Sequence, residues 1–207
     1  MSKGLLISFE GVDGAGKTTQ LDLLEDWLIS HRIPYLRTRE PGGTQLGIKI
    51  KNLLFHPPGS KMTPLEEMFL FQADRTEHFV EVVLPALEAG KLVITDRCFD
   101  ASIAYQGYGR GVDIELIEYL SLLAMQGRIP DLTILLNLDP ALIPERKEHR
   151  EINRLDAEPV SFFRRVHDGY LALVDAHPER IKVVDASRSP EAIHEEIVML
   201  VQQLLAP

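Results

Sequence analysis

Cysteine is nearly absent from this chain of 207 residues, where Cys98 is the only one. A single thiol excludes an intramolecular disulfide and fits a reducing compartment. Long apolar runs are missing as well, both at the N-terminus, where a signal segment would lie, and elsewhere at the length of a membrane span. We therefore expect a cytoplasmic protein without a membrane partner.

Basic residues are also few, because 22 lysines and arginines stand against 31 aspartates and glutamates and give a formal net charge of -9. This balance argues against a nucleic-acid partner and requires that any site for anionic phosphates be locally basic. Hydrophobic residues make up 45% of the chain and charged residues 26%. This composition fits one globular domain, over residues 1–207, that buries a core without metals or disulfides.

The most informative motif is Gly11-Val12-Asp13-Gly14-Ala15-Gly16-Lys17-Thr18, which fits the Walker A pattern G-x-x-x-x-G-K-[ST]. It follows the apolar run 5–9, so a buried strand leads into a glycine turn and a helix. In such a loop the backbone N–H groups surround phosphates, Lys17 reaches the β- and γ-phosphates, and Thr18 can ligate Mg²⁺. The motif predicts a nucleoside triphosphate ligand, and an ordinary glycine turn is the alternative.

Apolar, β-rich runs alternate with helix-length segments along the chain. The runs expected as strands are 5–9, 34–38, 92–95, 132–137 and 181–184. Helices are expected over 18–30 and near the C-terminus, and capping signals at Thr63 and Ser189 mark two further helix starts. The alternation predicts an α/β fold with a five-stranded parallel sheet flanked by helices.

Ligands of open α/β sheets bind beyond the carboxyl ends of the strands. Asp96 and Arg97 follow the third run directly, where Arg97 can hold a phosphate and Asp96 can orient Mg²⁺ or the attacking oxygen through water. A structural salt bridge explains the same pair. The turn 38–44, with a proline and two glycines, is either a site loop or a tight connection.

Two segments contain side chains suited to a planar base. Phe71 and Arg75 lie four residues apart on one helix face, where an aromatic ring can stack on the base and a guanidinium can bond its edge, although plain core packing explains the same spacing. The segment 102–111 mixes hydroxyls, an amide and three glycines. It either lines a pocket or ends a helix.

The segment 144–159 is strongly charged, poor in apolar residues and has proline at both ends. This pattern fits a mobile lid from which arginines reach the transferring phosphoryl group, and a solvated surface is the plainer alternative. The candidate basic residues are Arg146, Lys147, Arg150 and Arg154.

Taken in order, these motifs resemble the thymidylate kinase family over nearly the whole chain. The similar pieces are Phe9 to Thr19, Arg39 to Thr44, Phe71 with Asp74-Arg75, Asp96-Arg97, Ala104 to Gly107 and Gly109 to Gly111. The resemblance implies a P-loop NTPase fold with a mobile lid, a homodimer built on helices, and transfer of the ATP γ-phosphoryl group to dTMP. It places the chain with the bacterial type, in which the lid and not the P-loop supplies the catalytic arginine.

The resemblance also assigns residues. It implies that ATP is bound by Gly11, Val12, Asp13, Gly14, Ala15, Gly16, Lys17, Thr18 and Thr19. It implies that dTMP is bound by Asp13, Arg39, Lys51, Phe71, Arg75, Arg97, Ser102, Tyr105 and Gln106. The catalytic set would be Lys17, Asp13, Arg97, Arg146, Arg150 and Arg154, with Mg²⁺ at Thr18 and Asp96.

Within these sets, Arg97 would hold the acceptor phosphate, Phe71 would stack on thymine and Arg75 would bond its edge. Tyr105 would occupy the space of a ribose 2′-hydroxyl. The chain departs from the family in three places. Cys98 replaces a usual tyrosine or histidine, Lys51 replaces an arginine and supplies charge without a bidentate fork, and the lid reads Asn153 to Asp156.

Two other functions share part of this pattern. A kinase for another nucleoside monophosphate or for a deoxynucleoside would also have the Walker A and Asp-Arg motifs. A P-loop switch or motor protein is the more distant alternative, and a GTPase should carry Asn-Lys-x-Asp where this chain has Asn137-Leu138-Asp139-Pro140.

Overall fold

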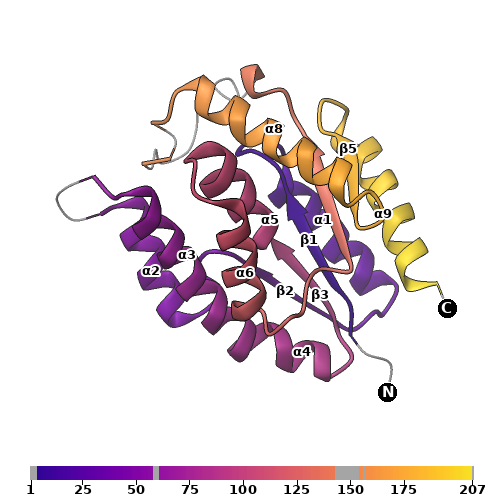
Figure 1. The fold of residues 1–207 in the computed structure, drawn as a ribbon. Coiled ribbons are helices and arrows are strands. Elements are labelled where there is room, and N and C mark those ends of the chain that lie inside the picture. The colour runs from indigo at the N-terminus through magenta and orange to yellow at the C-terminus, as the bar shows by residue number, and fades with distance from the viewer. Residues whose placement is uncertain (1–3, 58–60, 143–153, 156, 207) are drawn as a thin grey trace.

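The computed structural model describes residues 4–57, 61–142, 154–155 and 157–206, which fold around a parallel sheet (Figure 1). The strands are β1 (Leu6–Glu10), β2 (Tyr35–Arg39), β3 (Leu92–Asp96), β4 (Leu132–Asn137) and β5 (Ile181–Asp185). All the pairings are parallel, and the spatial order is β2-β3-β1-β4-β5. The predicted five-stranded α/β fold is confirmed, and each strand lies within one residue of its predicted run at either end.

Helices cover the sheet on both faces. They are α1 (Lys17–Ser30), α2 (Gln45–Phe55), α3 (Pro64–His78), α4 (Leu84–Glu88), α5 (Phe99–Ser102), α6 (Ile114–Ala124), α8 (Val160–Ala176) and α9 (Pro190–Leu205). π-Helical turns η1 (Phe79–Val83) and η2 (Ile103–Gly109) extend α3 and α5, and η3 (Pro140–Leu142) is a short 3₁₀ turn. Figure 1 shows α6 and α8 in front of the sheet and α1 behind it, where α1 packs against α9.

The helix starts that were expected from the sequence are present. The side chain of Thr63 accepts from Glu66 N at 3.2 Å, and Glu66 Oε2 accepts from Thr63 N at 2.8 Å, which completes the capping box before α3. Ser189 caps α9 through Ala192 N. Each of these helices begins with proline, whose missing N–H costs nothing at that position.

The core lies between the sheet and its helices. β1 is buried along its whole length and β3 and β4 nearly so, as their continuous apolar runs require for strands covered on both faces. On α1 the predicted stripe of Leu21, Leu24 and Leu28 is buried. Among the described residues, no helix has the length and hydrophobicity needed to cross a membrane.

The strand order creates a crevice above β1 and β3. The chain leaves central β1 for edge strand β2, returns to β3 and then passes to β4 on the other side of β1. Phe9 pairs with Asp96 across the two strands, and Arg97 N donates to Phe9 O at 3.0 Å. The loops after β1 and β3 therefore begin side by side at this switch point, where doubly wound folds bind their ligands.

Candidate active site

The loop between β1 and α1 has the backbone that the Walker A motif requires. Gly11 has φ 129° and Gly16 has φ 93°, backbone angles that residues other than glycine rarely adopt. A Cβ at Gly11 would also lie 2.5 Å from Leu136 O. The Lys17 ammonium folds over the loop and donates to Gly11 O at 3.1 Å and to Val12 O at 3.2 Å.

Burial, with repulsion from Arg97, lowers the pKa of Lys17 to about 8. The charged form of a lysine desolvated in this way is stabilised when an anion binds beside it, because the anion replaces the lost hydration and compensates the positive charge.

Arg97 joins the loop after β3 to the loop after β1. It adopts φ 74°, an uncommon conformation for a residue with a side chain and one often found at functional sites. Its guanidinium donates to Asp13 Oδ1 at 2.7 Å and to Gly11 O at 2.9 Å. It also lies 5.0 Å above the ring centroid of Tyr105.

A buried carboxylate that the sequence analysis missed supports this junction. Glu10 is the last residue of β1, so its sequence position indicates only a strand residue and not a site residue. It accepts Cys98 N at 2.7 Å and Tyr170 Oη at 2.9 Å, and so joins β1 to the loop after β3 and to α8. Burial, with repulsion from Asp100, raises the pKa of Glu10 to about 7.

A large cavity opens above the P-loop, and we call it the phosphate cavity. Its lining includes most of the predicted phosphate-binding residues: Asp13, Gly14, Gly16, Lys17, Thr18, Thr19, Arg39, Lys51, Asp96 and Arg97. Burial and the nearby Arg39 lower the pKa of Lys51. The cavity thus supplies the local positive charge that an acidic protein needs to bind phosphates.

A second, smaller cavity, which we call the base cavity, adjoins the first. Its lining combines predicted and unpredicted residues: Asp13, Glu40, Pro41, Phe55, Phe71, Arg75, Arg97, Cys98, Ala101, Ser102, Tyr105, Gln106 and Leu155. Asp13 and Arg97 line both cavities. The structure thus brings together the predicted P-loop, Asp-Arg and base-pocket residues.

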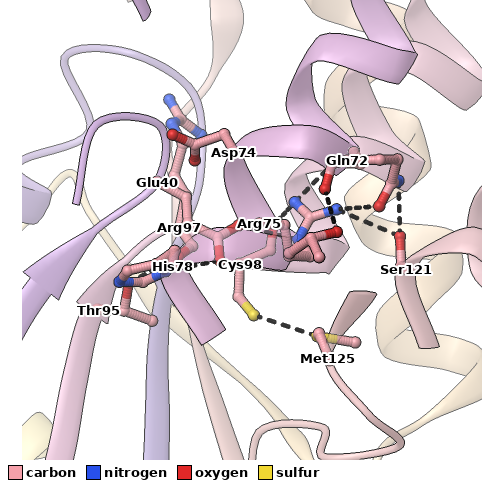
Figure 2. A network of polar contacts seen from close by, with 12 residues as sticks. Glu40, Gln72, Asp74, Arg75, His78, Thr95, Arg97, Cys98, Ser121 and Met125 are labelled. Atoms are coloured by element: carbon pink, nitrogen blue, oxygen red, sulfur yellow. Dashed lines mark hydrogen bonds and ion pairs between the residues drawn. The ribbon is translucent and has the colours of Figure 1, made fainter. Parts of the chain in front are cut away.

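Arg75, which lines the base cavity, lies at the centre of a buried polar network (Figure 2). Its Nε donates to Glu40 Oε2 at 2.9 Å and its Nη2 to Ser102 Oγ at 2.9 Å. The remaining donors reach Gln72, Ser121 and the Cys98 carbonyl at 3.2 to 3.3 Å. All five guanidinium donors are engaged, so a base that bonds to Arg75 must replace one of the longer contacts.

Glu40 anchors the turn after β2 to this network. It pairs with Arg75 and with His78 Nδ1 at 3.0 Å. Burial alone would raise the pKa of Glu40, but Arg75 and His78 reverse the effect and lower it. The sequence showed the charged pair 39–40 beside the turn but contained no sign of its distant partners on α3.

The residues predicted for the lid have different outcomes. Arg146 and Arg150 lie outside the described residues. Arg154 is described, and its guanidinium is bonded to α2 and α3: its Nη2 donates to Glu67 Oε2 at 2.7 Å and its Nε to Leu54 O at 3.0 Å. The next residue, Leu155, lines the base cavity.

The phosphate cavity also has oxygen donors suited to Mg²⁺. Thr18 lines it, and Asp96 Oδ1 is buried with no hydrogen-bond partner among the described residues. Mg²⁺ prefers a few hard oxygen ligands together with phosphate oxygens, so these two residues fit the ion.

Comparison with known proteins agrees with this geometry. The family model described as thymidylate kinase matches residues 9–197. The chain belongs to the thymidylate kinase family. A thymidylate kinase from Pelotomaculum thermopropionicum is 44% identical over 205 residues, which cover 98% of this chain and 95% of the relative. Another, from Gloeobacter violaceus, is 47% identical over 196 residues, covering 93% and 92%.

A solved member of the family has the same fold. The crystal structure of thymidylate kinase from Ehrlichia chaffeensis has a TM-score of 0.78 and 34% sequence identity, covering 97% of this chain and 99% of that one. The resemblance found in the sequence motifs is therefore confirmed, and so is the expected enzyme class.

Proposed function

We propose that the phosphate cavity binds ATP and the base cavity binds dTMP, and that Asp13 and Arg97 act where the two nucleotides meet. The reaction is transfer of the ATP γ-phosphoryl group to dTMP, giving dTDP and ADP, a step in dTTP synthesis. The observation that carries the proposal is the sharing of Asp13 and Arg97 by both cavities.

Catalysis at this junction depends on position and charge. A phosphate monoester has its second pKa near 6, so the dTMP phosphate is ionised at pH 7 and needs no strong general base. The main barrier is repulsion between two polyanions. Lys17 offsets it on the donor side and Arg97 on the acceptor side, with Arg39 and Lys51 adding charge to the phosphate cavity.

The base cavity has the chemistry of a thymine site. Phe71 stacks on the ring, and Arg75, Ser102 and Gln106 provide polar groups for its edge. Tyr105 fills the space beside the sugar, and the contacts from Arg97 hold its ring and hydroxyl. An added ribose hydroxyl would collide with this ring.

Thr18 and Asp96 would hold Mg²⁺, whose charge neutralises the phosphates when it is bound. We place the catalytic lid charge on Arg146 and Arg150 within the segment 144–159, as part of one domain over 1–207. Arg154 belongs to the same segment and receives a separate role below.

We further propose a cytoplasmic homodimer. The supporting feature is an exposed apolar surface on α3 and α6, helices that pack against each other. We call it the α3/α6 surface, formed by Leu65, Phe69, Leu116, Tyr119, Leu122 and Leu123. Exposed apolar patches of this kind mark protein interfaces.

A panel of acceptors tests the function. The enzyme is incubated with ATP, Mg²⁺ and either dTMP, dUMP, dCMP, AMP or thymidine, and the phosphorylated products are separated. We expect dTMP to give the highest kcat/KM. A preference for AMP or thymidine would support the neighbouring kinase activities instead, and nucleotide hydrolysis that depends on a partner protein would support a P-loop switch.

A further inference from the structure

Glu67 is a buried carboxylate behind the base cavity. It lies on α3 one turn before Phe71, and its side chain is 1% exposed. It accepts Gln106 Nε2 at 2.8 Å, Arg154 Nη2 at 2.7 Å and Arg110 Nε at 3.2 Å. Gln106 lines the base cavity, but Glu67 does not. Gln106 is therefore the cavity-lining residue to which Glu67 is hydrogen-bonded.

The Glu67 carboxylate fixes the orientation of the Gln106 amide. An ionised carboxylate only accepts hydrogen bonds, so the amide must turn its NH₂ group toward Glu67. The two guanidinium groups compensate the buried charge and keep the carboxylate an acceptor. Since Nε2 is taken by Glu67, Oε1 is the side-chain polar atom that Gln106 has left for the base cavity it lines.

Ser102 completes a directional pattern at the cavity wall. Its Oγ accepts Arg75 Nη2 at 2.9 Å, so its own proton remains available to donate. The wall therefore offers one acceptor from Gln106 and one donor from Ser102. Thymine has the complementary edge, because its N3–H donates and its O4 accepts. Cytosine has the opposite edge, with a bare N3 and an amino group.

We propose that Glu67 is the positioning residue that selects thymine over cytosine, by holding Gln106 with its oxygen toward the base. The inference rests on the proposed function and adds a cause for its base preference. Arg154 and Arg110 contribute to the same positioning, since they hold the Glu67 carboxylate in place. On this account the role of Arg154 is in base selection and not in contact with the transferred phosphoryl group.

The variant Glu67→Gln tests this role with little change of shape. The amide introduced at position 67 can donate or accept, so the Gln106 amide is free to flip and offer its NH₂ group to cytosine. The acceptors are dTMP, dUMP and 5-methyl-dCMP. The last keeps the methyl group and changes only the hydrogen-bonding edge.

We expect the preference for dTMP over 5-methyl-dCMP, measured as a ratio of kcat/KM, to fall roughly 10- to 100-fold. The ratio of dTMP to dUMP should stay within about threefold, because both have the same edge. Glu81→Gln, an exposed site on η1, is the matched control and should change neither ratio. An unchanged dTMP to 5-methyl-dCMP ratio in folded Glu67→Gln would overturn the inference, as would an equal loss on all three acceptors.

The reciprocal double variant Glu67→Gln with Gln106→Glu provides a second test. The amide now at position 67 donates to the carboxylate at position 106, and the other oxygen of that carboxylate accepts thymine N3–H, so the thymine preference should return. This variant also decides the question if Glu67→Gln alone does not fold, and failure to prefer thymine would contradict the inference. If the unaltered enzyme does not phosphorylate dTMP at all, the proposed function fails first.

Discussion

Arg97 Nη2 lies 2.7 Å from Asp13 Oδ1, so an ion pair joins the loop after β3 to the loop after β1. Both side chains are mostly buried, and both line the phosphate and base cavities. A charged hydrogen bond at this distance fixes the guanidinium before a nucleotide arrives. The acceptor phosphate is therefore expected to meet a cation that is already in position.

Replacing Arg97 with alanine should damage acceptor use far more than donor binding. Loss of its charge at the junction is expected to lower kcat/KM for dTMP roughly 10²- to 10³-fold, while the ATP Kd stays within about threefold, because Lys17 and the P-loop remain. Steady-state kinetics and calorimetric titration of ATP measure the two effects. Arg188→Ala, at a surface ion pair, is the control. Equal losses of dTMP use and ATP affinity would show that Arg97 serves the fold and not the acceptor.

ATP binding should weaken in alkaline solution. The pKa of Lys17 is about 8 in the folded protein, so the ammonium loses its proton above that pH. The Kd of a non-hydrolysable ATP analogue should be steady from about pH 7 to 7.5 and then rise by up to about tenfold per pH unit above 8. Lys17→Met should bind more weakly and without this dependence. A flat profile in the unaltered protein would contradict the lowered pKa.

Glu10 should make stability depend on pH in a predictable direction. The pKa of Glu10 is about 7 in the folded protein and exceeds the ordinary value of 4.5. Its contribution to the free energy of unfolding is therefore fully present below pH 4.5 and is lost as the pH rises through 7. Glu10→Gln stays neutral at every pH. Relative to the unaltered protein, the variant should therefore gain about 2 to 3 kcal/mol of unfolding free energy between pH 5 and pH 8.

Urea unfolding of both proteins at the two pH values gives this difference. Other titrating groups, such as Asp74, contribute equally to both proteins and cancel. If the difference in unfolding free energy between the two proteins does not change with pH, the pKa of Glu10 is not raised in the folded protein.

The proposed homodimer should depend on residues of the α3/α6 surface. Phe69 and Tyr119 are 52% and 61% exposed in the single chain. A charge in an apolar interface core is strongly unfavourable, so Phe69→Lys should yield a monomer in sedimentation velocity. Met199→Lys, at a 55% exposed site on α9, should leave the dimer intact. A dimer that survives Phe69→Lys would place the interface elsewhere.

The fold was largely predictable because its signals are local. Strands that are buried on both faces of the sheet appear in the sequence as short apolar runs. The cap at Thr63 depends only on residues within one helical turn. The P-loop was predictable for the same reason, since its glycines and Lys17 are contiguous.

The supporting residues were not predictable from local signals. Glu10 gains its role from Tyr170, which is 160 positions away, and Glu67 gains its role from Gln106 and Arg154, which are 39 and 87 positions away. Burial of a carboxylate against partners so distant leaves no periodic trace. Arg154 shows the opposite limit. Its charge was evident, but the direction in which its side chain points was not.

The most direct test of the central claim is the phosphorus balance of one reaction mixture. The purified enzyme is mixed with ATP, Mg²⁺ and dTMP, and ³¹P NMR follows every phosphorus species with time. The account predicts that dTDP and ADP appear in equal amounts, that inorganic phosphate does not accumulate, and that omission of dTMP stops ATP consumption. ATP consumed without dTDP, with inorganic phosphate as the product, would contradict it.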